Sequence, residues 1–358
     1  MLDYFDWFRQ KGWRTVVIVA RDEYSNELEC GAERIGYDIV YAPYSRRPNL
    51  RCLLAAILFT ARLMRSSTSE LHVFHTPVAS FIAAIARMFA PGRLCVYYCH
   101  GLVSYGQIGI KRMLLYAMER FTCKMADRVI FVSPSLAQYA VRHGYVDAKK
   151  VLGYQGSICG VMPNSVKSPR EIGSRSSIVL GYFGRICESK GVEHCFGVLD
   201  HLRLAGVEVR LIIGGQVEGD GGWFDSRVAS YRACVEYLGY VRDKEAFFNS
   251  IDLLLCPSSR EGFGMSALEA NSFGVPVVGF DIVGLRDAVQ TGETGFLVEP
   301  GSTPALAQAV AAYVGDPAIY FQHSSAALKR TGESFRRDEV LSSQFELIST
   351  LRKVKPTG

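Results

Sequence analysis

The amino-acid sequence predicts an α/β protein built from two doubly wound parallel sheets, one in each of two domains. The chain has 358 residues, which exceeds the size that one hydrophobic core usually supports. Short apolar runs rich in β-branched residues alternate with helix-length segments along the chain. Such runs are typical of parallel strands that are buried on both faces and connected by helices. The alternation stops once, in the polar stretch after residue 163, and then begins again.

The first half of the chain contains one predicted helix followed by five predicted strands. The helix is LDYFDWFRQKGW at the N-terminus. The strands are residues 15–20, 38–42, 71–75, 94–99 and 128–133. We interpret residues 1–165 as the N-terminal domain. Residues 166–177 show no hydrophobic periodicity and contain several turn formers, so we interpret them as the linker.

The second half repeats the pattern. Its predicted strands are residues 178–184, 207–215, 252–256 and 275–280. We interpret residues 178–330 as the C-terminal domain and residues 331–358 as a C-terminal helix that packs back toward the N-terminal domain. Doubly wound sheets bind ligands at the carboxyl ends of their strands. A functional site is therefore expected at the strand-to-helix turns.

Composition favours a globular protein of a reducing cytoplasm. The ten cysteines form no CxxC pair and no zinc-type cluster, which indicates buried free thiols. No secretion signal is visible, and the longest apolar run, CLLAAILF, is too short to span a bilayer. Residues 1–170 hold 22 Lys and Arg against 12 Asp and Glu. This basic half favours an anionic partner such as phospholipid or a lipid diphosphate, and the lack of a recognition motif disfavours nucleic acid.

The stretch SREGFGMSALEA, residues 259–270, has two interpretations. In the first, GFGMSA fits the dinucleotide pattern G-x-G-x-x-A, and Asp281 is the acid that binds ribose. This interpretation predicts an NAD-dependent enzyme. However, the pattern requires the glycine turn to follow the strand directly, whereas five residues intervene here.

The second interpretation places a nucleotide sugar at this turn. A helix beginning near Met265 would point its first N–H groups at a diphosphate, and Gly262 and Gly264 would let the backbone approach closely. Glu261, in the loop, could reach a sugar, and Glu269, just beyond the first helical turn, could accept hydrogen bonds from a ribose. Each glutamate taken alone is more simply a partly buried or solvated carboxylate.

A second motif favours the nucleotide-sugar interpretation. In LGYFGRICESKGVEH a strand ends at Gly184, and Arg185 and Lys190 follow at the entrance of the next helix. A guanidinium and an ammonium can neutralise a diphosphate there, with charge-assisted hydrogen bonds of about 1.5 to 3 kcal/mol each. A single Arg or Lys would be an ordinary surface charge, but two motifs at strand-to-helix turns of one sheet predict a shared site.

These motifs resemble those of the retaining glycosyltransferases of the GT-B fold that carry a Glu-x7-Glu motif, the family 4 type. GYFGRICESKG resembles their phosphate-binding segment, LGYV (residues 238–241) the segment over the base, and PSSREGFGMSALEANSFGVPVV the signature. TGETGFLVEPG follows at the family's position, and MPNSV (residues 162–166) resembles the hinge. HTP, YYCHGL and ADRVIFVSPS give the first half a looser resemblance to members that build bacterial surface polysaccharides.

The resemblance implies roles for individual residues. Glu269 would bind the donor's ribose and Glu261 its hexose. Arg185 and Lys190 would hold the diphosphate and stabilise the charge that develops as it leaves. His100 would face the donor sugar from the N-terminal domain. Further substrate contacts are implied for Asn164, Gly184, Tyr240, Val241, Gly262, Phe263, Gly264, Met265 and Ser266.

The implied reaction moves a hexose or N-acetylhexosamine from a nucleoside-diphosphate sugar, with UDP as the expected nucleotide, and retains the anomeric configuration. The acceptor would be a saccharide or a polyprenyl-diphosphate-linked saccharide. No Asp-x-Asp with a preceding strand is present, so we predict no metal and no other cofactor. No carboxylate nucleophile stands out, which agrees with the front-face attack that the family implies.

The sequence departs from the family pattern in two places. Family members begin with a strand and a glycine-rich loop, whereas here the predicted helix leads into residues 15–20, which correspond to the second strand. The lack of a central strand is expected to expose apolar edges. Either the true start lies upstream of Met1, or the chain is a truncated, inactive nucleotide-binding homologue. VGLRD, residues 283–287, also has one glycine and an Asp in place of Gly-Gly-x-x-Glu.

Two basic amphipathic segments are the sequence features that indicate which acceptor the protein uses. The arginines around CLLAAILF are Arg46, Arg47, Arg51, Arg62 and Arg65. The second segment is KRMLLYAMERFTCK, residues 111–124. Such helices suit attachment to anionic lipid, although helices packed on a sheet with snorkelling arginines give the same pattern. With attachment, the protein would be peripheral on the inner face of the plasma membrane.

Overall fold

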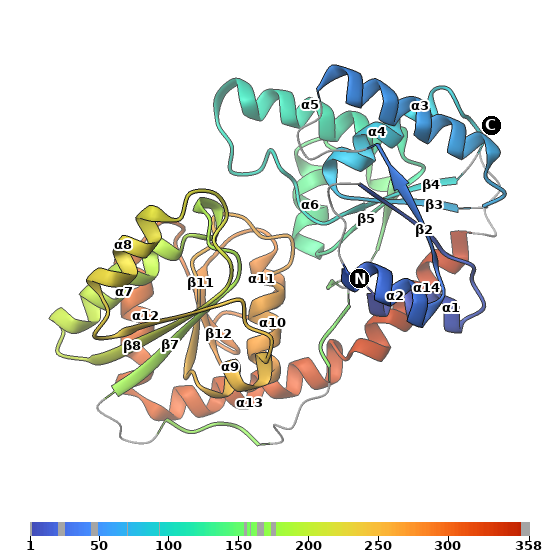
Figure 1. The fold of residues 1–358 in the computed structure, drawn as a ribbon. Coiled ribbons are helices and arrows are strands. Elements are labelled where there is room, and N and C mark those ends of the chain that lie inside the picture. The colour runs from blue at the N-terminus through green and yellow to red at the C-terminus, as the bar shows by residue number, and fades with distance from the viewer. Residues whose placement is uncertain are drawn as a thin grey trace. The chain divides into compact units, whose positions relative to one another are not determined.

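The computed structural model describes residues 2–20, 26–43, 49–69, 71–92, 94–153, 156–157, 159–162, 168–172 and 177–351. Asn164 and residues 166, 167 and 173–176 of the predicted linker lie outside the described residues. The chain divides into two compact units, which are Met1–Gly160 with Asp338–Gly358, and Val161–Arg337. Both units are parallel α/β structures, as the sequence predicts (Figure 1).

The N-terminal unit has its strands in two separate parallel sheets. One sheet pairs β1 (Val16–Ala20) with β2 (Asp38–Ala42). The other has the order β3-β4-β5-β6, formed by Leu71–His75, Leu94–Cys99, Arg128–Phe131 and Val151–Leu152. The five predicted strands are confirmed within two residues at each end. The short β6 escaped prediction because two residues form no recognisable hydrophobic run.

The division of this sheet leaves apolar side chains of β1 exposed. Val17 and Ala20 are buried, whereas Val16 and Ile18 are 43% and 36% exposed. In β4, which has a neighbour on each side, every side chain is buried. Among the described residues no ladder joins β1 or β2 to β3. With β2 as its ladder partner in a two-stranded sheet, β1 leaves part of its apolar surface exposed.

Helices surround these strands. They are α1 (Leu2–Gln10), α2 (Asn26–Ile35), α3 (Leu50–Ser66), α4 (Pro77–Arg87), α5 (Gly109–Met125) and α6 (Pro134–Arg142). Side-chain caps define some of their starts, since the Asn49 side chain accepts a hydrogen bond from the Cys52 N–H at 2.8 Å. Ile57, Met64 and Ile82 belong to the core between α3 and α4.

The last helix, α14 (Arg337–Leu351), packs within the N-terminal unit. The Phe345 ring centroid lies 5.3 Å from that of Phe8 and 5.6 Å from that of Trp13. The sequence predicts one continuous helix after residue 331, but the structure breaks it at Phe335. The ring of Phe335 packs against Phe263 instead, with centroids 5.6 Å apart, which ends the preceding helix and lets α14 begin separately.

The C-terminal unit contains a six-stranded parallel sheet of order β12-β11-β10-β7-β8-β9. Its strands are β7 (Ser177–Phe183), β8 (Glu208–Gly214), β9 (Val235–Gly239), β10 (Leu253–Cys256), β11 (Val277–Phe280) and β12 (Gly295–Val298). The four interior strands are the four that the sequence predicts. The two edge strands, β9 and β12, are only partly buried, so they lack the continuous apolar run that identified the others.

The helices of this unit are α7 (Val192–Leu204), α8 (Gly222–Ser230), α9 (Lys244–Asn249), α10 (Met265–Ser272), α11 (Leu285–Ala288), α12 (Thr303–Gly315) and α13 (Pro317–Ser334). Figure 1 shows α7 beside α12 and α10 beside α13. The chain runs from β7 through β8 to β9, and β10 then returns to the other side of β7. The carboxyl ends of β7 and β10 therefore form the topological switch point, where such sheets bind ligands.

Candidate functional site

Two loops meet at the switch point of the C-terminal unit. Residues 184–190 follow β7, and residues 257–264 follow β10. The backbone N–H of Ser259 donates to the carbonyl of Ser189 at 3.0 Å. At Gly191, with φ +65°, an added Cβ would lie 2.1 Å from the Pro257 oxygen. Only glycine fits this close approach, so the backbone itself holds the two predicted motifs together.

Lys190 and Glu261 form an ion pair between these loops. The Lys190 Nζ lies 2.6 Å from Oε1 of Glu261, and the two side chains are 21% and 10% exposed. The Ser258 hydroxyl donates to the same Oε1 at 2.8 Å. A lysine ammonium carries three donors, so Lys190 can hold the Glu261 carboxylate and still bond an anion. The ion pair joins two residues that the sequence analysis assigned to one site.

Glu269 lies on α10 and pairs with a residue that the sequence analysis did not select. Its Oε1 lies 2.6 Å from the Nζ of Lys244, the first residue of α9. The same Nζ lies 5.6 Å from the centroid of the Phe183 ring. No sequence pattern links Lys244 to Glu269, because their proximity depends on how α9 packs beside α10.

Arg185 is placed in the same loop as Lys190 but contacts a different carboxylate. Its Nη1 lies 2.6 Å from Oε1 of Glu218, and both side chains are exposed. The hydrogen bond that Arg185 donates to Glu218 raises the pKa of the guanidinium, so Arg185 stays cationic. The backbone carbonyl of Arg185 accepts a hydrogen bond from the Tyr182 hydroxyl at 2.7 Å. The structure thus anchors the loop while leaving this cation at the surface, where an anion could replace Glu218.

The α10 helix begins at Met265, as the sequence predicts, with Gly264 at its N-cap in a left-handed conformation of φ 93°. The first N–H groups of a helix have no acceptor within the helix, which makes this end suited to an anion. A Cβ on Gly284 would lie 2.5 Å from the Glu261 oxygen and 2.7 Å from the Gly262 oxygen. The single glycine of VGLRD therefore supports the loop that carries Glu261.

The other predicted contacts lie around the same strand ends. The ring of Phe263 is buried against Phe335, so only its backbone is available to a ligand. Ser266 lies in the first turn of α10, with its hydroxyl 3.8 Å from the sulfur of Cys256. Tyr240, directly after β9, is 62% exposed.

Close backbone contacts fix the ends of β7, β8 and β9. The N–H of Gly184 donates to the carbonyl of Gly214 at 2.9 Å. A Cβ on Gly215 would lie 1.7 Å from the Gly184 oxygen, and one on Gly214 would lie 2.7 Å from Cγ2 of Val241. Gly184 and Val241 are therefore structural neighbours at the end of the sheet, where small residues let the chains converge.

His100 lies in the N-terminal unit, directly after β4. Its Nε2 is 2.9 Å from Nδ1 of His75, which ends β3. Burial lowers the pKa of His100 to about 4, so the imidazole is neutral near pH 7. His75 was not selected from the sequence as a site residue. Only the parallel register of β3 and β4 brings the two histidines together.

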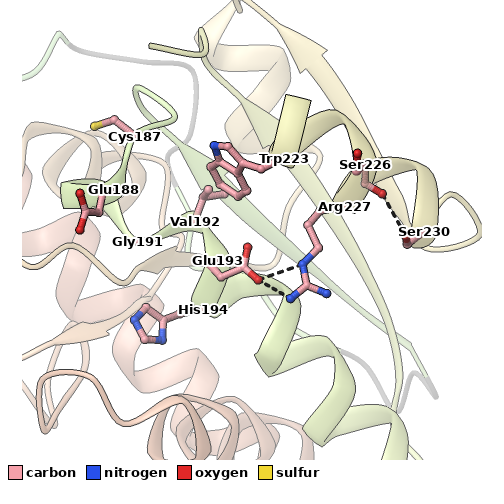
Figure 2. A pocket seen from close by; sticks show the side chains of 10 residues that line it. All are labelled: Cys187, Glu188, Gly191, Val192, Glu193, His194, Trp223, Ser226, Arg227 and Ser230. Carbon is pink, nitrogen blue, oxygen red and sulfur yellow. Dashed lines mark hydrogen bonds and ion pairs between the residues drawn. The ribbon is translucent and has the colours of Figure 1, made fainter. Parts of the chain in front are cut away.

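A pocket of about 740 Å³ lies beside the β7 loop, between α7 and α8. Figure 2 shows Trp223 and Arg227 of α8 on one side and Glu193 of α7 on the other, with Nε of Arg227 2.9 Å from Oε1 of Glu193. The pocket shares Cys187 and Gly191 with the loop region. None of the four predicted charged residues, which are Arg185, Lys190, Glu261 and Glu269, lines it.

Comparison with known proteins identifies two matching families. The family described as "Glycosyl transferases group 1" matches residues 177–316, and "Glycosyltransferase Family 4" matches residues 2–152. A similar protein is the capsular polysaccharide biosynthesis glycosyltransferase CapM of Staphylococcus aureus. It is 27% identical over 289 residues, which cover 78% of this chain and 76% of CapM.

Two solved structures share the fold at low identity. Sucrose-phosphate synthase from Thermosynechococcus elongatus superposes with a TM-score of 0.78 at 19% identity, covering 98% of this chain and 92% of that one. Anabaena HepE in complex with UDP gives a TM-score of 0.74 at 20% identity, covering 97% and 94%. These likenesses show a common two-domain architecture.

Proposed function

The chain belongs to glycosyltransferase family 4 and has the GT-B fold, and from this we propose that it is a retaining glycosyltransferase using a UDP-sugar. It would move a hexose or N-acetylhexosamine to a saccharide or a polyprenyl-diphosphate-linked acceptor. The name of CapM supports a role in surface polysaccharide synthesis, and the UDP complex of HepE supports the nucleotide. The observation that carries the proposal is the Lys190–Glu261 ion pair at the switch point, beside the start of α10.

The diphosphate of the donor would lie between the two loops. Lys190 and the first N–H groups of α10 would bind it, joined by Arg185 once this side chain exchanges Glu218 for phosphate oxygens. Cations and helix N–H groups held in place before the reaction stabilise charge as it develops on the leaving group, at no cost in reorganisation. This arrangement needs no metal, so we propose metal-independent transfer.

The two glutamates would orient the rest of the donor. Glu269 would accept hydrogen bonds from the ribose hydroxyls after releasing Lys244, and Glu261, held by Lys190 and Ser258, would accept from the sugar. His100 would contact the same sugar from the N-terminal unit. Retention would follow from front-face attack by the acceptor, guided by the leaving phosphate.

We extend the proposal to a lipid surface on the acceptor side. The exposed apolar side chains of α3 and the start of α5 are Leu50, Leu54, Leu58, Ile108, Ile110, Met113 and Leu114. Exposed cations beside them are Arg51, Arg62, Lys111 and Arg112. The α4 helix lies between α3 and α5, in contact with both (Figure 1). We call this set the α3–α5 face.

Charge and exposure favour an anionic membrane as the partner of the α3–α5 face. The α3 helix contains no acidic residue, and Glu119 in α5 is buried. Leu50 and Leu58 are exposed well beyond half of their surface, which a helix packed on a sheet with snorkelling arginines does not explain. Apolar residues next to cations bind the headgroup region of anionic bilayers. No helix within the described ranges is long and apolar enough to cross a bilayer.

Isothermal titration with UDP, GDP and NAD, in the absence of metal, tests the donor site. We expect UDP to bind, and Glu269→Ala and Arg185→Ala to weaken binding about tenfold or more, or 1.4 kcal/mol per factor of ten. Arg210→Ala is the matched control, because Arg210 forms an exposed pair with Glu236 on β8 and β9. Binding of NAD alone would support the dinucleotide interpretation instead. UDP binding without sugar transfer by the wild type would support an inactive homologue instead.

A further inference from the structure

Three aromatic side chains stack at the carboxyl ends of β3 and β4. His75 and Tyr98 are partners in the parallel register, and their ring centroids lie 5.2 Å apart at an interplanar angle of 20°. Tyr98 and His100 stack in the same way, at 5.2 Å and 23°. Because residues 98 and 100 project from the same face, His75 and His100 lie next to one another against the Tyr98 ring.

The two histidines share one hydrogen bond. Nδ1 of His75 lies 2.9 Å from Nε2 of His100. Burial lowers the pKa of His75 to about 3 and that of His100 to about 4, so both rings are neutral near pH 7. A neutral imidazole has one N–H donor and one acceptor nitrogen. One ring must therefore donate and the other accept, and the tautomer of each depends on that of its partner.

The surrounding structure holds His75 in this position. The Tyr4 ring, from α1, meets His75 edge-on with centroids 6.1 Å apart. The next residue, Thr76, has φ 67° and ψ 144°, a conformation that residues with a Cβ rarely adopt. This sharp turn lets α4 begin at Pro77 while His75 stays on the strand beside Tyr98. Strained backbone of this kind persists only where the surrounding contacts enforce it.

We propose that His75 is a positioning residue for His100, holding its ring in place and coupling its tautomer to that of His75 through the Nδ1–Nε2 hydrogen bond. The inference rests on the proposed function, in which His100 contacts the donor sugar. While His75 keeps one tautomer, the remaining nitrogen of His100 presents one character, donor or acceptor, to a sugar hydroxyl. This fixed character would favour one orientation of the sugar.

Two substitutions separate the hydrogen bond from the packing of the ring. His75→Phe keeps an aromatic ring against Tyr98 but removes the nitrogen. His75→Asn places an amide group near the position of Nδ1 and can again bond Nε2 of His100. His72→Phe is the matched control, since His72 lies on the same strand and projects to the opposite face of the sheet. Thermal melting establishes that each variant is folded.

Imidazole 15N NMR of the full chain, labelled at histidine, reads the tautomer without any need for activity. We expect His100 to show one tautomer in the wild type, in His75→Asn and in His72→Phe, and averaged nitrogen shifts in His75→Phe. In transfer assays His75→Phe should lower kcat about tenfold to a hundredfold, the scale of a misplaced reactive group. The UDP Kd should stay unchanged, and His75→Asn should recover most of the rate.

An unchanged single tautomer of His100 in folded His75→Phe would overturn the inference, as would full kcat in that variant. Failure of the proposed function would appear differently, as an absence of sugar transfer by the wild type. In that case the NMR comparison still decides whether His75 fixes the tautomer of His100.

Discussion

Replacing Lys190 with glutamine should weaken UDP binding about tenfold to a hundredfold. Its Nζ lies 2.6 Å from Glu261, and the side chain is 21% exposed, so the ammonium is already ordered and partly shielded from water before a ligand binds. A charge-assisted hydrogen bond contributes about 1.5 to 3 kcal/mol, and about 1.4 kcal/mol corresponds to a factor of ten in Kd. Glutamine keeps the length of the side chain near that of lysine but removes the charge.

The assay compares ligands that differ only in the diphosphate. Isothermal titration of Lys190→Gln with UDP and with uridine should show a loss for UDP and little change for uridine. Glu261→Gln is the matched variant. The UDP affinity of Glu261→Gln should stay within about threefold of the wild-type value, because the substitution removes a carboxylate and not a group that binds phosphate. The additional affinity that the sugar of a UDP-sugar provides should become weaker. Arg210→Gln, in an exposed pair on β8, should change neither.

Two results would exclude Lys190 as a specific ligand of the diphosphate. Equal UDP affinity in the wild type and in Lys190→Gln would mean that Lys190 does not contact the diphosphate. A parallel loss for uridine and UDP would mean that the substitution disturbs the whole loop. The unfolding free energies of the two single variants and of Lys190→Gln/Glu261→Gln together give the coupling energy of the ion pair. This coupling energy shows how much of the loss in affinity comes from disturbing the loop and how much from losing a ligand contact.

Three further predictions concern other parts of the molecule. The wild type should bind UDP more tightly than 2′,3′-dideoxy-UDP, and Glu269→Ala should remove that preference; a preference that persists in the variant would exclude Glu269 as the ribose ligand. Ile110→Ser/Met113→Ser should reduce sedimentation with anionic vesicles at low salt without changing UDP affinity, whereas unchanged sedimentation would exclude the α3–α5 face. The unfolding free energy should fall as pH decreases from about 6.5 toward 4, since the unfolded histidines take up protons there while His75 and His100, with pKa values lowered to about 3 and about 4, do not. Each histidine contributes at most about 1.4 kcal/mol per pH unit to the slope of the unfolding free energy against pH. His75→Phe/His100→Phe should reduce this slope, and an unchanged slope in the double variant would contradict the lowered pKa values.

The interior strands and the strand-to-helix turns could be predicted from the sequence, because burial on both faces leaves a continuous apolar run. The start of α10 at Met265 was predictable for a second reason, since Gly264 supplies the left-handed turn before it. The edge strands β9 and β12 were not, because partial burial removes that run. A parallel strand can therefore be predicted from the sequence when it is buried on both faces.

The sequence patterns select the charged residues proposed for the site, but not the residues that pair with them. Lys190 and Glu261 stood out because each follows a strand end. Lys244 and Glu218 did not, because they reach Glu269 and Arg185 only through the packing of α9 and of the loop after β8. The contact of His75 with His100 likewise depends on the register of β3 and β4, which the sequence does not display.

Retaining, metal-independent transfer can be measured by incubating each of a panel of UDP-sugars with the purified chain, anionic vesicles and a polyprenyl-diphosphate-linked saccharide, in the presence of EDTA. Proton NMR would record both UDP release and the anomeric configuration of the product. We expect acceptor-dependent release of UDP, a product with the anomeric configuration of the donor, and loss of both signals in Lys190→Gln. Release that requires added metal, or a product of inverted configuration, would contradict this expectation.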